Sequence, residues 1–309
     1  LGIETTFVDP ADPDNFARAM RPNTRAVYGE TIGNPLVNVL DIGSIADVAH
    51  AHGVPLVIDN TVASPYLCNP LLLGADIVVH SATKYIGGHG TTMGGVIVES
   101  GRFAWDNGHF PEMVEPSRAY HGVKFYETFG DFGYTMKARM EVNRTFGAVL
   151  SPLSAWLLLQ GAETLHLRMR EHCRNARRVA EFLQKHPRVA WVNYPGLPDS
   201  PYYELASKQF RPVDGQPGAS GILTFGIQGG AAAGERFIDA CEFLSHLANI
   251  GDAKTLVIHP ASTTHRQLSD EELQQAGVSA DMVRLSVGIE DVDDILWDID
   301  QALARCGTA

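Results

Sequence analysis

The sequence lacks a long apolar run, an excess of basic residues and any pairing of cysteines. No apolar stretch approaches the ~20 residues that a membrane-spanning helix requires, and the opening LGIETTFVD does not resemble a signal peptide. The formal net charge of −12 argues against a nucleic-acid binder, because such proteins cluster lysine and arginine. We therefore expect neither a membrane nor nucleic acid as a partner, and a cytoplasmic location by default.

Cysteine is scarce: the four cysteines stand far apart, with no Cys-x-x-Cys pair. This usage favours reduced thiols over a disulfide framework or a zinc site. The histidines suggest a metal hydrolase as one alternative, but they never form a His-Glu-x-x-His pattern, so we expect no metal site. The histidines concerned are His80, His89, His121, His259 and His265.

The 309 residues suffice for roughly two domains, and 45% of them are hydrophobic, which is enough to bury a core. The first half alternates between short β-branched runs and segments with helical spacing, which predicts βαβ units and a parallel sheet. A further run over residues 95–98 is expected to return antiparallel or at the sheet edge. The expected strands cover residues 6–8, 24–28, 56–60 and 75–80, and the expected helices cover residues 12–20 and 42–52.

The second half changes character. Residues 101–134 form a loop-rich segment with many aromatic side chains, which either pack an irregular insertion or form an active-site wall or a subunit contact. A helix over residues 163–185 is long enough to bridge two domains. We therefore predict a large domain at residues 1–168 and a smaller α+β domain at residues 169–309. Other expected elements are a helix at 154–161, strands at 191–196, 221–227 and 255–258, and helices at 233–247 and 292–304.

Two apolar runs, LVIDN and ADIVVH, read as strands buried on both faces, and each is followed by polar chemistry. Asp59 follows Ile58, whereas Lys84 follows the second run in a turn with two hydroxyls. The carboxyl ends of parallel strands meet at the edge where α/β proteins bind ligands. By itself Lys84 is most simply a surface lysine, but a desolvated lysine can attack a carbonyl carbon. Asp59 requires a positive partner if it is buried, and a pyridinium nitrogen would provide one. Ser81 and Thr83 would then donate hydroxyls to a phosphate.

Several motifs along the whole chain strengthen this interpretation. They are VIDNT, HSATKYIGGHG, GNP at 33–35, AVLSP at 148–152, RMREHCRNA, HPAST at 259–263 and RLSVGIE at 284–290. Together they resemble the Cys/Met metabolism enzymes, a family of fold-type-I proteins that use pyridoxal 5′-phosphate. The resemblance implies an α/β fold with a mostly parallel sheet in the cofactor domain and a smaller C-terminal α+β domain.

The resemblance also implies roles for individual residues. Arg284 matches the clamp for the substrate α-carboxylate, a role that suits a bidentate guanidinium. The cofactor positions implied are Lys84 as the Schiff-base lysine, Asp59 at the pyridinium nitrogen, Ser81 and Thr83 at the phosphate, and Asn34 near the phenolic oxygen.

The stretch SHLANIGDAKTLVIHPASTTHRQLS is similar to the sulfhydrylase branch of the family, with Asn249 where many lyases carry serine. We expect Asn249 to contact substrate. The implied reaction converts O-acetylhomoserine and sulfide to homocysteine and acetate. O-succinylhomoserine sulfhydrylase, cystathionine γ-synthase and methionine γ-lyase activities stay open, as does cysteine or another thiol in place of sulfide.

Members of the family carry a further segment before the point where this sequence starts, so we expect the cofactor domain to be incomplete at its N-terminus. The resemblance further implies a homotetramer built as a dimer of dimers.

Two alternatives belong to other classes. A nucleotide binder is suggested by the glycines of GGHGTTMGG, but this loop leads into a predicted strand rather than the helix that such sites need. A non-catalytic scaffold is disfavoured because Asp59, Lys84 and Arg284 are all present.

Overall fold

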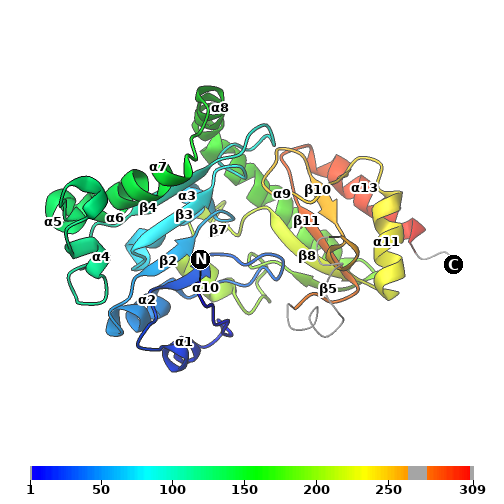
Figure 1. Cartoon of the computed structure of the whole chain (residues 1–309). Helices are drawn as coiled ribbons and strands as arrows, with labels where there is room; N and C mark the ends of the chain where they lie inside the picture. Colours follow the sequence, from blue (N-terminus) through cyan, green and yellow to red (C-terminus); the bar gives the residue numbers. More distant parts are fainter. Residues whose placement is uncertain (1, 264–276, 307–309) are drawn as a thin grey trace.

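The computed structural model describes residues 2–263 and 277–306, which form two lobes, each built on its own β-sheet. The blue-to-cyan strands lie in one lobe and the yellow-to-red elements in the other, with α9 (Leu165–Lys185) running between them (Figure 1). This arrangement agrees with the mixed α/β class predicted from the sequence. Within the described ranges, no helix is both long enough and apolar enough to cross a membrane.

The first sheet has four strands in the order β1-β2-β3-β4. The first three are parallel, and β4 pairs with β3 in the antiparallel direction at the edge, which confirms the expected return. Helix α2 (Ile42–Ala51) connects β1 to β2 and confirms the predicted helix at 42–52. The strands are β1 (Val27–Glu30), β2 (Leu56–Asp59), β3 (Ile77–Ser81) and β4 (Gly95–Glu99).

The two faces of this sheet differ. Leu56 and Ile58 of β2 are fully buried and share a core with Ile42 and Ile45 of α2. The alternate residues of β2 are only partly buried, and Tyr28 of β1 is 56% exposed. The prediction that the central strands are buried on both faces is therefore wrong for the second face, which packs against an aromatic cluster over only part of its area.

Near the N-terminus, one prediction fails and one is confirmed. Residues 6–8 form no strand, and Phe7 is 93% exposed, because this segment has no neighbouring strand to pair with among the described residues. The expected capped helix is present as α1 (Pro13–Ala19). Its N-cap is Asp12, whose side chain accepts a hydrogen bond from the backbone N–H of Asp14 at 3.0 Å.

The aromatic segment at residues 101–134 packs mainly against itself. The Phe103 and Trp105 ring centroids lie 4.8 Å apart, and Trp105 stacks on Tyr134 with centroids 5.4 Å apart. Together with Phe125, which is fully buried, these rings cover Ile77 of β3. Interior packing is thereby confirmed for this cluster. The helices of this segment and of the stretch that follows it are short: α4 (Pro111–Val114), α5 (Phe125–Phe129), α6 (Gly133–Lys137) and α7 (Arg144–Phe146).

Helix α9 contributes to both cores. Leu165 and Met169 pack in the core of the first lobe, whereas Val179 and Leu183 pack in the core of the second. The helix therefore connects the two lobes, as its length suggested. The domain boundary expected after residue 168 falls inside this helix and stays a prediction. Helix α8 (Pro152–Glu163) precedes it and covers the helix predicted at 154–161.

The second sheet has five strands in the order β5-β8-β11-β10-β9 and is antiparallel except at the β10–β9 pair. It confirms the expected α+β character of the second half. The strands are β5 (Val189–Asn193), β8 (Ile222–Ile227), β9 (Ser245–His246), β10 (Leu256–Ile258) and β11 (Met282–Ser286). The remaining α-helices of the described residues are α3 (Ser64–Leu67), which follows β2 of the first sheet, and α10 (Tyr203–Gln209), α11 (Gly230–Ala240) and α13 (Val292–Arg305). A small separate pair of strands consists of β6 (Pro212–Val213) and β7 (Gln216–Pro217).

The helix expected at 233–247 ends earlier, because α11 stops at Ala240. The fully buried carboxylate of Asp298 on α13 accepts hydrogen bonds from the next backbone N–H groups at 2.8–2.9 Å, which holds them in a turn instead of a helix. The donors are Glu242, Phe243 and Leu244.

Replacing Asp298 with asparagine is expected to lower the free energy of unfolding by about 3 kcal/mol, because an amide replaces one acceptor oxygen and leaves buried N–H groups unsatisfied. Urea denaturation measures the change. Asp293→Asn on the same helix is the control: its ion pair with Arg178 is exposed, so its loss is expected to cost less than about 1 kcal/mol. Equal losses in the two variants would contradict this role of Asp298.

All four cysteines are free thiols. Burial raises the pKa of the Cys68 and Cys173 thiols to about 12, which keeps them protonated and unreactive at neutral pH. Within residues 2–263 and 277–306, no group of three or more His, Cys, Asp or Glu side chains could hold a metal ion. His265 lies outside the described residues.

Candidate active site

The carboxyl ends of the parallel strands bring the predicted polar residues to one edge of the sheet. Asp59 is the last residue of β2 and pairs in register with Glu30 of β1 and Val79 of β3. Ser81 is the last residue of β3, and Lys84 follows in the turn. Such an edge is where open α/β sheets bind ligands.

The Asp59 carboxylate is held by two donors. One oxygen accepts the backbone N–H of Thr61 at 2.8 Å, and the other accepts the hydroxyl of Tyr28 at 3.3 Å. Among the described residues Asp59 makes no ion pair. Its negative charge raises the pKa of the neighbouring Glu30, for which burial is the larger cause. The site therefore offers an oriented carboxylate that lacks a cation.

Lys84 is a half-buried amine. Its Nζ donates a hydrogen bond to Oδ1 of Asn249, which lies in the segment before β10 in the other lobe. Burial lowers the pKa of Lys84, and the positive charge of Arg284 lowers it further. A lowered pKa favours the neutral amine, the form that attacks a carbonyl or accepts a proton.

Arg284 lies in the middle of β11 and is 7% exposed. Its Nη1 donates to Oδ1 of Asn34 at 2.9 Å, and its Nη2 donates to the carbonyl of Asn249 at 3.1 Å. Its Nε is buried without a hydrogen-bond partner, and no carboxylate pairs with it within the described part of the chain. Burial lowers the pKa of Arg284 to about 10. The guanidinium therefore lacks the anion that normally accompanies a buried arginine.

Asn249 connects the two cationic residues. Its side chain accepts from Lys84, and its backbone carbonyl accepts from Arg284. Asn34 reaches the same network through Arg284, although it lies at the end of the first sheet. The structure thus brings Lys84, Arg284, Asn249 and Asn34 together from both lobes.

Thr83 and Ser81 are held by different hydrogen bonds. The Thr83 hydroxyl donates to the carbonyl of Gly94 at 3.3 Å and accepts from the Gly94 N–H at 3.1 Å. Ser81 is placed by its backbone N–H, which donates to the Thr61 hydroxyl at 2.7 Å. Their roles at a phosphate stay predictions.

The glycine-rich turn after Lys84 leads into β4 and not into a helix. Gly88 and Gly90 have φ values of +71° and +62°, which side-chain-bearing residues rarely adopt. The nucleotide-binding alternative needs a helix N-terminus at this point, so the structure does not support it.

Sequence reasoning missed two supporting residues, Tyr28 and Thr61. Tyr28 reaches Asp59 across neighbouring strands, and Thr61 links the ends of β2 and β3. One signal in the sequence could have found Tyr28. It stands two residues before Glu30, so both side chains lie on the same face of the strand, and Glu30 is the residue that pairs in register with Asp59.

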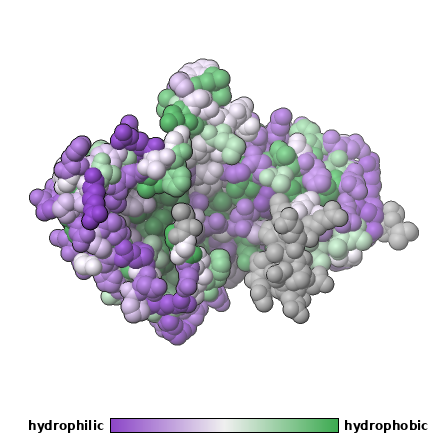
Figure 2. Space-filling view, viewed as in Figure 1, coloured by the Kyte–Doolittle hydropathy of each residue, from purple (hydrophilic) through white to green (hydrophobic). Residues whose placement is uncertain are grey.

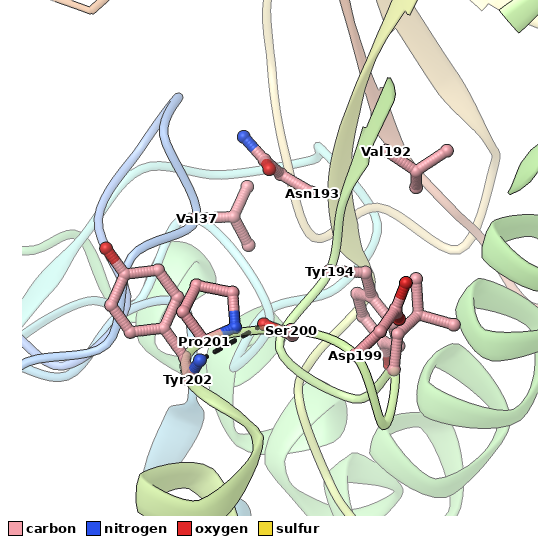
Figure 3. Close-up of a pocket in the computed structure, with 9 residues that line it drawn as sticks. Val37, Val192, Asn193, Tyr194, Asp199, Ser200, Pro201 and Tyr202 are labelled. Atoms are coloured by element: carbon pink, nitrogen blue, oxygen red, sulfur yellow. Dashed lines mark hydrogen bonds between the residues drawn. The ribbon is translucent and has the colours of Figure 1, made fainter. Parts of the chain in front are cut away.

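A separate cavity of about 70 Å³ lies between β5, the segment before α10 and the loop that carries Val37 (Figure 3). Tyr194 and Tyr202 line it, but neither Lys84 nor Arg284 does. It is too small for an amino-acid substrate and is not the candidate active site.

The chain belongs to the family described as Cys/Met metabolism PLP-dependent enzyme, whose model matches residues 1–304. It is therefore an enzyme that depends on pyridoxal phosphate.

Several curated relatives share this family. The chain is 53% identical to the O-acetyl-L-homoserine sulfhydrylase of Leptospira meyeri and 51% identical to the homocysteine synthase of Schizosaccharomyces pombe. Each alignment covers 98% of this chain and 70% of the relative. A crystal structure of a Campylobacter jejuni protein assigned as an O-acetylhomoserine (thiol)-lyase superposes with a TM-score of 0.91 at 38% identity, over 96% of this chain and 70% of that one. That structure contains a pyridoxyl-lysine monophosphate.

The residues present fit this cofactor. Lys84 offers a partly desolvated amine, and Asp59 offers a carboxylate without a cation. The Nε of buried Arg284, which has no partner among the described residues, offers a site for a substrate anion near Lys84.

Proposed function

We propose that the chain catalyses the replacement of the acetate group of O-acetylhomoserine by sulfide, which gives homocysteine. The observation that carries the proposal is the network in which Asn249 joins the Lys84 amine to the guanidinium of Arg284. An amino-acid substrate of such a reaction requires both groups at one place, a guanidinium that binds its carboxylate and an amine that moves protons at its carbons. The names of the similar proteins from Leptospira meyeri and Schizosaccharomyces pombe support the same reaction.

In this proposal, Arg284 binds the α-carboxylate through its free Nε, and Asn34 orients its guanidinium. Asp59 would hold the positive ring nitrogen of the cofactor, and Ser81 and Thr83 would bind its phosphate. Pyridoxal phosphate, when bound, supplies an electron sink. Lys84 Nζ moves protons at Cα and Cβ of the substrate, because its lowered pKa leaves a larger neutral fraction.

The test is a comparison of substrates with purified protein and pyridoxal phosphate. We expect homocysteine from O-acetylhomoserine and sulfide, with a lower kcat/KM for O-succinylhomoserine. Assays with cysteine in place of sulfide, and with methionine alone, test the synthase and lyase alternatives. A preference for the succinyl ester, or release of methanethiol from methionine as the faster reaction, would overturn the proposal.

We also propose that the protein is a homotetramer and acts in the cytoplasm. Support for self-association comes from α8, where Leu153, Trp156 and Leu159 are 55–65% exposed. Figure 2 shows hydrophobic surface over this helix. Light scattering coupled to gel filtration measures the assembly, and a monomeric mass at micromolar concentration would contradict it.

A further inference from the structure

The RMREHCRNA motif lies on α9, and two of its side chains hold the residue that follows Lys84. Arg168 and His172 are one helical turn apart, so they share a face of the helix. Arg168 is 4% exposed and His172 is fully buried. Both contact Tyr85, which is itself fully buried.

Arg168 fixes the main chain of the turn after Lys84. Its Nη1 donates to the carbonyl of Tyr85 at 2.7 Å, and its Nη2 donates to the carbonyls of Ile86 at 3.2 Å and Gly161 at 2.6 Å. No ion pair of Arg168 occurs among the described residues, and burial lowers its pKa. A buried cation bonded only to neutral acceptors is costly, and only the planar guanidinium fork can reach several carbonyls at once.

His172 connects the same turn to the strand that carries Arg284. Its ring meets Tyr85 edge to face, with centroids 5.1 Å apart and an interplanar angle of 86°. Its Nδ1 lies 2.7 Å from the carbonyl of Val287, just after β11, so Nδ1 must carry the proton and donate. The hydroxyl oxygens of Ser220 and Tyr85 lie 3.1 Å apart, within hydrogen-bond distance, and this contact fixes the far end of the Tyr85 ring.

We propose that Arg168 and His172 are positioning residues that set the place of Lys84 relative to Arg284. Arg168 holds the turn of Lys84, and His172 ties this turn to β11. The inference rests on the proposed roles of Lys84 and Arg284. It gives the RMREHCRNA motif of α9 a role, although, within the described part of the chain, Arg168 and His172 make no hydrogen bond with Lys84, Asn249 or Arg284.

The test measures Lys84 itself in the cofactor-free protein. An amine-reactive acylating reagent is applied over a range of pH, and peptide mass spectrometry gives the pH midpoint of Lys84 labelling, with exposed Lys208 in the same digest as reference. In Arg168→Met and His172→Phe, the freed turn exposes Lys84, so the midpoint is expected to rise by about one pH unit. Arg168→Lys and His172→Asn, which keep a charge or a donor, are expected to shift it less.

The control is Arg177→Met on the same helix, because Arg177 also donates to a backbone carbonyl, that of Pro217 at 2.9 Å, away from the site. It is expected to leave the midpoint unchanged. With cofactor and substrates, His172→Phe is expected to raise KM for O-acetylhomoserine more than it lowers kcat, because Arg284 is no longer held at a fixed position relative to Lys84.

Folded Arg168 and His172 variants with a lower melting temperature but an unchanged Lys84 midpoint would mark both residues as ordinary core side chains and overturn the inference. If the wild type makes no homocysteine, the proposed function fails, whereas the labelling midpoint still tests the positioning of Lys84.

Discussion

Replacing Lys84 with alanine is expected to lower the rate of homocysteine formation by about 10³-fold, because the site loses the amine that moves protons at the substrate carbons. Lys84 is the group whose lowered pKa suits this task, and its Nζ lies beside Asn249 in the network with Arg284. The measurement is the steady-state rate with saturating O-acetylhomoserine and sulfide in excess pyridoxal phosphate. The visible absorbance of the lysine-bound cofactor is expected to persist through dialysis of the wild type and to be absent from the variant.

A second variant separates the amine of Lys84 from its charge, and a third serves as the control. Lys84→Arg keeps the positive charge but cannot give up a proton at neutral pH, so we expect it to be as inactive as Lys84→Ala. Lys254→Ala removes an exposed lysine from the loop between Asn249 and β10 and is expected to retain full activity. If Lys84→Ala keeps more than about a tenth of the wild-type rate, another group moves the protons and the assigned role is wrong.

The first sheet and its ligand edge could be predicted from the sequence because the signals are local. Asp59 and Lys84 each follow an apolar β-branched run, and parallel strands necessarily end at the same edge. The failures arise where tertiary contacts decide. Residues 6–8 have strand-like composition but find no partner strand in the described part of the chain. The helix after residue 233 stops because a distant carboxylate, Asp298, binds the next backbone N–H groups.

The network around Arg284 could not be predicted at the level of contacts. The family resemblance implied a carboxylate clamp, yet Asn34 lies 250 residues away in the sequence and Asn249 lies 35 away. Their meeting depends on how the two lobes are joined, and this is fixed by α9 and its contacts with both cores. The hydrophobic periodicity of the sequence predicts helix α9, but it does not predict which loops and turns of the chain the polar side chains of α9 contact.

Replacing Arg284 with leucine is expected to raise KM for O-acetylhomoserine by about 100-fold, with a smaller fall in kcat. The buried Nε has no hydrogen-bond partner among the residues that the structure describes, so it is the donor that a substrate carboxylate would engage. A charge-assisted hydrogen bond of this kind contributes about 1.5–3 kcal/mol, and the value rises where water is excluded. Initial rates over a range of ester concentrations, with sulfide fixed, give both constants.

The variant Arg284→Lys tests whether the substrate carboxylate is bound by the positive charge of Arg284 or by the geometry of its guanidinium. Lysine keeps a cation but lacks the planar fork that bonds Asn34 and the Asn249 carbonyl while presenting Nε to a ligand. We therefore expect it to recover little of the loss in KM. Arg236→Lys is the matched control, because Arg236 donates from Nε to the carbonyl of Cys306 in the same lobe and has no place in the site. Recovery of wild-type KM in Arg284→Lys would mean that the substrate carboxylate is bound by positive charge alone, and the unpartnered Nε would then have no part in binding it.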